Sequence, residues 1–449
     1  MEIGYNTCIM PRYSIEFFIN EGEEGNYIPS LLDGVVDFDK NDPFELKLIE
    51  ILRQPEYMRM ARIPQLGFVE HSIPTANHSR LMHQIDATDL MRELIVWSNR
   101  NYGKTRAKAW DFNLKEQAAI AAPFMHDIGH AFPGHPFERA IKDMVKKGMF
   151  KSEYKNHEKW GIEIIQRSNI YNILNSYSAG FADKVLDVLS EDNMENSIWQ
   201  QIESGNLNID TFAYLQRDQQ QTKPAGEYNK YRAHRIIENV KFGTTPSGGH
   251  CVILKPEFQT HFHFMKMLEI RGEMYSDVYF NGVPASAEAF LGKFFEEIYK
   301  ATDSGKLESD NPFVKFIESE GTDYGAYLYL TADAFYNLVD ELSKLNIPGL
   351  SDIARNYKNI RANFSAVEIY KGDADHAPSD AEIQAKKEDV ESRGGVFRDV
   401  PVPLYDMKKP EVYCIPHTGG APQKFSECYP EFVNRKFRII SGFFMGNSR

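Results

Sequence analysis

The sequence predicts a mainly α-helical protein with a small β-hairpin and a C-terminal α+β appendage. From residue 44 to residue 301, apolar residues recur at helical spacing over most of the chain. A Gly-rich turn flanked by alternating apolar residues interrupts this pattern at 238–256, which is typical of a hairpin. Beyond a charged stretch with Pro and Gly at 371–395, which is either a linker or a loosely packed charged helix, short β-branched and aromatic runs predict strands.

The same observations divide the chain into three regions. Residues 1–43 are expected to be irregular with short strands, because no helical period is present there. Residues 44–301 form the predicted helical domain. Residues 302–449 form a C-terminal helical and α+β region, for which we expect a role in oligomerisation or regulation.

The helical domain is expected to contain a series of amphipathic helices. In 77–100, Leu81 and Ile85 begin a run of apolar residues near a 3.6-residue repeat, and Asn77 or Ser79 is the expected cap. Further helices are expected at 114–130, 135–147, 156–176, 181–190, 208–220, 256–281 and 284–301. Strands of the C-terminal appendage are expected at 396–406, 411–418 and 435–444.

Composition excludes several classes of protein. A formal net charge of -13 argues against broad, non-specific coating of nucleic acid, which needs a basic surface. The four cysteines are scattered, without a CxxC pair, and are expected to be reduced thiols. The N-terminus lacks the pattern of a signal peptide, and no apolar run is long enough to cross a bilayer. We therefore expect a cytoplasmic protein without a membrane partner.

One short stretch concentrates groups that bind metals and transfer protons. FMHDIGHAFPGH, residues 124–135, contains His126, Asp127, His130 and His135. Imidazole and carboxylate are ligands for divalent cations such as Mn, Fe, Mg, Ni or Zn. On the predicted helix His126 and His130 share one face, and a Pro-Gly turn would fold His135 back towards them. The alternative is a set of histidines satisfied in the core or on the surface.

Other segments supply groups that this stretch lacks. Arg80 and His83 are three residues apart and neighbours on a helix face, and His157 lies in NHEKWG. In a later helix, Asp210 and Tyr214 begin a stripe at intervals of four. Aspartates within a half-apolar stripe are difficult to explain by packing alone.

Two further residues extend this pattern towards an anion site. Asp218 ends the stripe that Asp210 begins, and it could instead pair with Arg217. Arg271 and Tyr279 are two turns apart on another helix. A guanidinium group suits phosphate bidentately, so Arg271 is a candidate clamp, although a single arginine is more often a solvated charge.

These segments together resemble the HD-domain metal-dependent phosphohydrolases, and in detail the deoxynucleoside triphosphate triphosphohydrolases, which include bacterial dGTPases and the SAM-and-HD-domain dNTPase. The resemblance covers residues 44–300, in the order of that family. It rests on QPEYMRMARIPQLGF (54–68), RLMHQ (80–84), HDIGHAFPGH (126–135), NHE (156–158), DTFAYLQRD (210–218) and RGEMYSDVY (271–279).

The resemblance implies a role for each matched residue. One divalent cation (Mn, Mg, Fe or similar) would be bound by His83, His126, Asp127 and Asp210. The catalytic histidines would be His130, His135 and His157. The substrate would contact Gln65, Leu66, Arg80, Tyr214, Asp218, Arg271 and Tyr279.

The implied reaction converts a deoxynucleoside triphosphate (dNTP) to a deoxynucleoside and inorganic triphosphate, with dGTP as the expected substrate. The resemblance also implies a homo-oligomer, a tetramer or hexamer. It leaves open whether a further Mg²⁺ accompanies the triphosphate and whether nucleotides or single-stranded DNA act as effectors.

Thr211 departs from the pattern of the SAM-and-HD-domain enzyme, which has a phosphate-binding lysine there. Lys223, Lys230, Arg232 and Arg235 lie downstream and are candidate substitutes. Two alternatives stay open at this stage. The first is a phosphohydrolase of another nucleotide: a monophosphate, a cyclic dinucleotide or an alarmone. The second is a regulatory or nucleic-acid-binding protein with a vestigial site.

Overall fold

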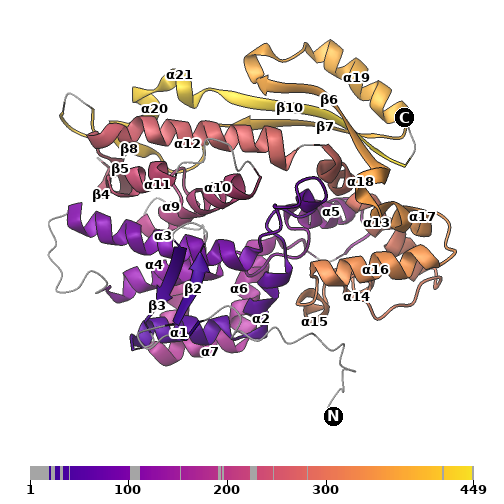
Figure 1. Ribbon diagram of the computed structural model, residues 1–449, viewed down its shortest axis with the longest axis horizontal. Coiled ribbons are helices and arrows are strands. Elements are labelled where there is room, and N and C mark those ends of the chain that lie inside the picture. Colours follow the sequence, from indigo (N-terminus) through magenta and orange to yellow (C-terminus); the bar gives the residue numbers. More distant parts are fainter. Residues whose placement is uncertain are drawn as a thin grey trace.

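The computed structural model gives a mainly helical molecule with three small sheets, as the sequence predicts (Figure 1). It describes residues 20–21, 26–30, 34–39, 41–101, 112–151, 153–190, 194, 197–222, 230–245, 247–280, 282–416 and 419–446. Cys8 and Lys223 therefore lie outside the described residues. Cys251, Cys414 and Cys428 are free thiols. Within the described part of the chain, no helix is long and apolar enough to cross a membrane.

The N-terminal half contains a short sheet followed by helices that build the core. The sheet consists of β1 (Asn20–Glu21), β2 (Asn26–Ser30) and β3 (Gly34–Phe38). The helices are α1 (Pro43–Leu52), α2 (Pro55–Met58), α3 (Arg80–Asn101), α4 (Leu114–Met125), α5 (His135–Lys146), α6 (His157–Arg167), α7 (Asn169–Tyr177), α8 (Phe181–Leu189), α9 (Ile198–Ser204), α10 (Ile209–Thr222) and α11 (Lys230–Ile237). α3 packs against α4 and α10, so the helices that carry the candidate metal ligands are direct neighbours.

The expected helix at 114–130 is wrong at its C-terminal end. α4 ends at Met125, and a turn follows in which the backbone N–H of Ile128 bonds to Met125 and that of His130 bonds to Asp127. The physical reason is the close approach of α6, because a Cβ on Gly129 would lie 1.9 Å from the His157 carbonyl oxygen. His126 and His130 therefore do not share a helix face. The single helix expected at 156–176 is also divided, at Ser168, into α6 and α7.

The predicted hairpin is present, and a C-terminal strand extends its sheet. β4 (Val240–Thr244) pairs antiparallel with β5 (His250–Leu254). β8 (Val412–Cys414) then pairs in parallel with β5, and β9 (Gln423–Lys424) completes the sheet. The C-terminal region is thus joined to the helical domain by backbone hydrogen bonds.

The remaining helices and the third sheet all follow β5 in the sequence. The helices are α12 (Thr260–Met274), which continues into a π-helical turn (Tyr275–Tyr279), α13 (Gly282–Asp303), α14 (Pro312–Glu318), α15 (Tyr324–Tyr327), α16 (Ala332–Lys344), α17 (Leu350–Tyr357), α18 (Ile360–Asn363), α19 (Asp380–Ser392), α20 (Phe425–Cys428) and α21 (Pro430–Val433). The strands are β6 (Phe364–Asp373), β10 (Lys436–Met445) and β7 (Val396–Pro403), in that order across an antiparallel sheet. α19 packs against β7 and β10 at the upper edge of Figure 1, and α13 packs against β6 and β10.

Candidate active site

A cavity of about 480 Å³ collects nearly all of the residues singled out by the sequence. Its lining includes Gln65, Leu66, Arg80, His126, Asp127, His130, His135, His157, Asp210, Tyr214, Asp218, Arg271 and Tyr279. His83, which is fully buried, lies directly behind this lining and contacts His126 and Asp210. The structure therefore brings the predicted residues together, whereas the role of each one stays a prediction.

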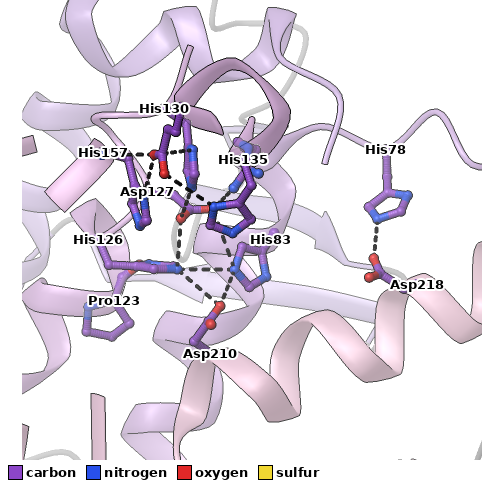
Figure 2. Close-up of polar contacts among 12 residues, drawn as sticks. His78, His83, Pro123, His126, Asp127, His130, His135, His157, Asp210 and Asp218 are labelled. Atoms are coloured by element: carbon purple, nitrogen blue, oxygen red, sulfur yellow. Dashed lines mark hydrogen bonds and ion pairs between the residues drawn. The ribbon is translucent and has the colours of Figure 1, made fainter. Parts of the chain in front are cut away.

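His83, His126, Asp127 and Asp210 form a group that we call the cation cage (Figure 2). Nε2 of His83 lies 3.2 Å from Nε2 of His126 and 2.8 Å from Oδ1 of Asp210. Asp127 is slightly farther away, with Oδ1 at 3.5 Å from His126 Nε2. The four side chains come from α3, from the turn after α4 and from α10. Their nitrogen and oxygen atoms thus lie close together.

A hydrogen bond on the other side of His126 fixes which ring nitrogen faces the cage. Its Nδ1 lies 2.8 Å from the Pro123 carbonyl oxygen, which can only accept, so the Nδ1–H is the donor. Nε2 therefore faces Asp127 and Asp210: it donates its N–H to Asp210 when the ring is charged, and it offers a lone pair when the ring is neutral. Burial lowers the pKa of His126, but Asp127 and Asp210 raise it to about 10. The cage therefore attracts positive charge.

Asp127 stays ionised because of a buried arginine. Nη1 of Arg80 donates to Oδ2 of Asp127 at 2.5 Å. Burial by itself would raise the pKa of Asp127, but Arg80, followed by His126 and His130, holds it well below its ordinary value. Gly134, with φ at +87°, allows this arrangement, since a Cβ there would lie 2.8 Å from Nη2 of Arg80.

A second group, the histidine–glutamate cluster, consists of His130, His135, Glu138 and His157 (Figure 2 shows the histidines). Nδ1 of His157 donates to Oε1 of Glu138 at 2.6 Å, and its backbone N–H donates to the same oxygen at 2.9 Å. The rings of His130 and His157 are stacked with centroids 3.9 Å apart. His135 is the exposed member, with 61% of its side chain accessible and Nδ1 at 3.6 Å from Glu138.

Glu138 separates the protonation of the two stacked rings. Burial lowers the pKa of His157, but Glu138 raises it above its ordinary value. For His130, burial and then Arg80 and His157 lower the pKa well below its ordinary value. His157 therefore keeps its charge to higher pH than His130 does. Opposed pKa shifts in neighbouring groups are the usual basis for acid and base roles.

The turn between the two groups is held by contacts from distant parts of the chain. The hydroxyl of Tyr327, on α15, donates to the Gly129 carbonyl at 2.6 Å. Nη1 of Arg59 donates to the His130 carbonyl at 2.7 Å. Both donors are buried. The turn therefore has a fixed conformation that does not depend on a helical ladder.

An aromatic and carboxylate corner lies beside the cation cage. The Tyr279 hydroxyl donates to Oδ2 of Asp218 at 2.6 Å, and Oδ1 of Asp218 lies 2.7 Å from Nε2 of His78. Tyr214 packs edge-on to Tyr279 with centroids 6.4 Å apart. Asp218 is therefore fixed between two partners, and its alternative pairing with Arg217 does not occur, because Arg217 pairs with Asp86.

Positive charge enters the cavity from two further directions. Burial lowers the pKa of Arg271, but Tyr214 and Tyr275 raise it above its ordinary value. Lys409, from the segment after β7, also lines the cavity, and its Nζ donates to the Ser204 carbonyl at 2.5 Å. Of the downstream cations suggested by the sequence, Arg235 pairs with Glu238 and is not part of the cavity lining.

Sequence reasoning missed Glu138, Glu203 and Lys409, all of which line or face this cavity. Glu138 had a local signal, since it lies three residues after His135 on α5 and thus on the same face. Glu203 lies in the last turn of α9, seven residues before Asp210, without a motif of its own. Lys409 is far from the other residues in sequence and is brought in only by the tertiary fold.

The cage residues fit a divalent cation. Two imidazole nitrogens and two carboxylates are the donor set that Mn, Fe, Zn or Mg accept in proteins. Nδ1 of His126 is also fixed by a backbone carbonyl, as ligating histidines usually are. The histidine–glutamate cluster also has the donor types of a metal site, but Glu138 already balances the charge of His157 there.

Comparison with known proteins finds a family match over the part of the chain that contains most of the candidate residues. Residues 68–199 match the HD domain family. The chain is 26% identical over 271 residues to an uncharacterized protein of Bacillus subtilis, YwfO. That alignment spans 59% of this chain and 55% of the relative, so the chain spans little more than half the length of the relative.

Two solved structures share the fold over nearly the whole chain. A phosphohydrolase of Bacteroides thetaiotaomicron matches with a TM-score of 0.67 and 18% identity, covering 92% of this chain and 98% of that one. A hypothetical protein of Aquifex aeolicus matches with a TM-score of 0.66 and 17% identity, covering 94% and 96%. The matched HD segment contains His83 and the whole stretch from His126 to His157. The likeness to the HD domain family is therefore limited to residues 68–199, the part of the chain that carries these histidines.

Proposed function

We propose that this chain is a metal-dependent phosphohydrolase that cleaves dNTPs to a deoxynucleoside and inorganic triphosphate. The observation that carries the proposal is the side-by-side arrangement of the cation cage and the histidine–glutamate cluster in one cavity. Asp127 joins them, because its Oδ1 lies 3.5 Å from His126 and 3.3 Å from Nε2 of His130. The HD domain and the solved phosphohydrolase of similar fold support the same class of reaction.

The cation cage would hold one divalent cation. When bound, this cation would withdraw electrons from a phosphoryl oxygen and so favour attack at phosphorus. Arg80 keeps Asp127 ionised for this purpose. We therefore propose that the main role of Arg80 is to keep the Asp127 carboxylate charged through their hydrogen bond. Binding of the triphosphate would be its secondary role.

The histidine–glutamate cluster would handle the protons. The bond between the water oxygen and the α-phosphorus forms, the bond from phosphorus to O5′ breaks, and O5′ takes a proton from His157. Glu138 raises the pKa of His157 and so favours its charged form for this step. His130 is the neutral imidazole and the acceptor for the proton of the water. His135 would contact the α-phosphate from the exposed side.

The triphosphate needs cations along its length. Arg271 and Lys409 line the cavity on the substrate side, and Thr211 lines it as well. We propose that Lys409 provides the ammonium group that the SAM-and-HD-domain enzyme places at the position of Thr211. One N–H of Lys409 is used by Ser204, so two remain for phosphate oxygens.

The sugar would lie in the aromatic corner. Tyr214 would pack against C2′ and exclude a 2′-hydroxyl, while Tyr279 would close the sugar pocket. Gln65, whose backbone is fixed by His78, and Asp218 would bind the 3′-hydroxyl, with Leu66 beside Gln65. dGTP is the proposed substrate, and assembly into a tetramer or hexamer remains a prediction.

The test is incubation of the purified protein with each dNTP and each ribonucleotide, with Mn²⁺ or Mg²⁺, followed by ion-exchange separation of products. We expect a deoxynucleoside and inorganic triphosphate, with little turnover of ribonucleotides. Release of pyrophosphate or orthophosphate would contradict the proposal. Turnover of monophosphates or cyclic dinucleotides instead would favour a different phosphohydrolase.

A further inference from the structure

Glu203 is a buried carboxylate in the cavity wall without a hydrogen-bond partner. It lies in the last turn of α9, is 6% exposed, and lines the same cavity as the cation cage. Neither Oε1 nor Oε2 has a hydrogen-bond partner among the described residues. A buried polar group without a partner costs about 1–3 kcal/mol, and more if it is charged, so such a group needs an explanation.

The charges around Glu203 indicate what would satisfy it. The pKa of Glu203 is raised to about 7: burial raises it most, His126 opposes this, and Asp210 and Asp127 add to the rise. Its electrostatic neighbours are thus members of the cation cage. His126 is the neighbour that can carry positive charge, and it is neutral when it acts as a ligand. The negative charge of the Glu203 carboxylate would then be balanced by the bound cation.

Direct ligation does not fit the geometry. Asp127 contacts His126 at 3.5 Å and His83 at 3.8 Å, whereas among the described residues no hydrogen bond or ion pair joins Glu203 to a residue of the cage. A carboxylate at the edge of a metal site, with two unused oxygens facing a cavity, is instead suited to accept hydrogen bonds from ordered water.

We propose that Glu203 is an outer carboxylate of the cation cage: it adds a third negative charge without direct ligation, and its oxygens bind water between α9 and the cage. This inference rests on the proposed function only in assigning a cation to the cage. In the proposed hydrolysis, water ordered by Glu203 on this side would be oriented next to the phosphorus. Glu203 is then a positioning residue for both the cation and water.

The test measures cation binding directly. The full chain is stripped with a chelator and titrated with Mn²⁺ by isothermal titration calorimetry, as wild type, Glu203→Gln, Glu203→Asp and Glu288→Gln. Glu288 is the matched control, because it is also largely buried and lines the same cavity but pairs with Arg139 at 3.2 Å. Circular dichroism checks that each variant is folded.

We expect Glu203→Gln to weaken Mn²⁺ binding about 10–100-fold, the usual effect of removing an outer partner of a metal site. Glu203→Asp should lose less, because it keeps the charge, and Glu288→Gln should bind as the wild type does. Unchanged binding in Glu203→Gln, or an equal loss in Glu288→Gln, would overturn the inference. A wild type that binds Mn²⁺ but does not cleave dNTPs would refute the proposed substrate and leave the role of Glu203 intact.

Discussion

The two groups of histidines and carboxylates in the cavity differ in where their charge is balanced. In the cation cage, Pro123 fixes the ring of His126 so that Nε2 faces the two carboxylates of Asp127 and Asp210. In the histidine–glutamate cluster, one carboxylate, Glu138, is already bonded to His157. The first group thus has two carboxylates facing one imidazole, whose proton a bound cation would replace, while the second pairs one carboxylate with one imidazole. Histidines and carboxylates are thus arranged for cation binding in one group and for proton transfer in the other. One hydrogen bond in each group makes this difference: His126 to Pro123 in the first, and His157 to Glu138 in the second.

The largest effect is expected from a change within the cation cage. Asp210→Asn removes the charge that faces both His83 and His126, at 2.8 and 3.3 Å. Turnover of dNTP at saturating Mn²⁺ should fall by at least about a thousandfold, as when a group acting in the transition state is lost. Initial rates by ion-exchange chromatography test this. Near-normal turnover would mean that the cation cage takes no part in the reaction.

A change in the histidine–glutamate cluster should be smaller and depend on pH. Glu138→Gln removes the partner that raises the pKa of His157. The charged form of His157 would then be lost at a lower pH than in the wild type. The alkaline limb of the pH–rate profile should therefore shift to lower pH. We expect kcat near neutral pH to fall about a hundredfold, the usual share of one proton-transfer group. A lower kcat with an unshifted profile would mean that Glu138 acts only on the fold.

Lys409→Met should affect binding of the substrate more than the chemical step. We expect KM for dNTP to rise about tenfold, the cost of one lost hydrogen bond to a charged group, with kcat nearly unchanged. Adding Thr211→Lys in the same chain should restore KM in part, because Thr211 lines the same cavity. A fall in kcat alone would mean that Lys409 supports the C-terminal end of α9 through Ser204 and does not bind phosphate.

The smallest expected effect is on the free energy of unfolding of the metal-free protein. Glu203 has a pKa of about 7 in the folded protein against an ordinary value of 4.5, so folding is favoured when it is protonated. That stability is present below pH 4.5 and lost as the pH rises to 7. Glu203→Gln should therefore be more stable than wild type by about 1–3 kcal/mol at pH 8 and similar at pH 4. Urea denaturation at both pH values measures this, and a difference independent of pH would contradict it.

The sequence predicted those parts of the fold with a clear local period. The helix expected at 77–100 is α3, and the hairpin expected at 238–256 is β4 and β5. β6 was missed because it is an edge strand with mixed burial, which leaves little alternation. The charged stretch at 371–395 contains α19, whose capping box of Ser379 and Glu382 is visible in the sequence.

The candidate site shows the same limit. Motifs with fixed spacing identified His126, Asp127 and Asp210 without knowledge of the fold. The turn after α4 was not predictable, because Arg59 and Tyr327 hold it from distant positions. Glu203 and Lys409 reach the cavity through tertiary packing alone, and no local pattern marks them.

The most direct test of the division between the two groups is a Mn²⁺ titration of Asp210→Asn and Glu138→Gln beside the wild type. Both groups have ligand types that hold a metal, so the titration decides between them. We predict that Asp210→Asn loses the bound cation and that Glu138→Gln retains it with nearly unchanged affinity. Loss of the cation in Glu138→Gln, with binding intact in Asp210→Asn, would place the metal in the histidine–glutamate cluster and contradict the account.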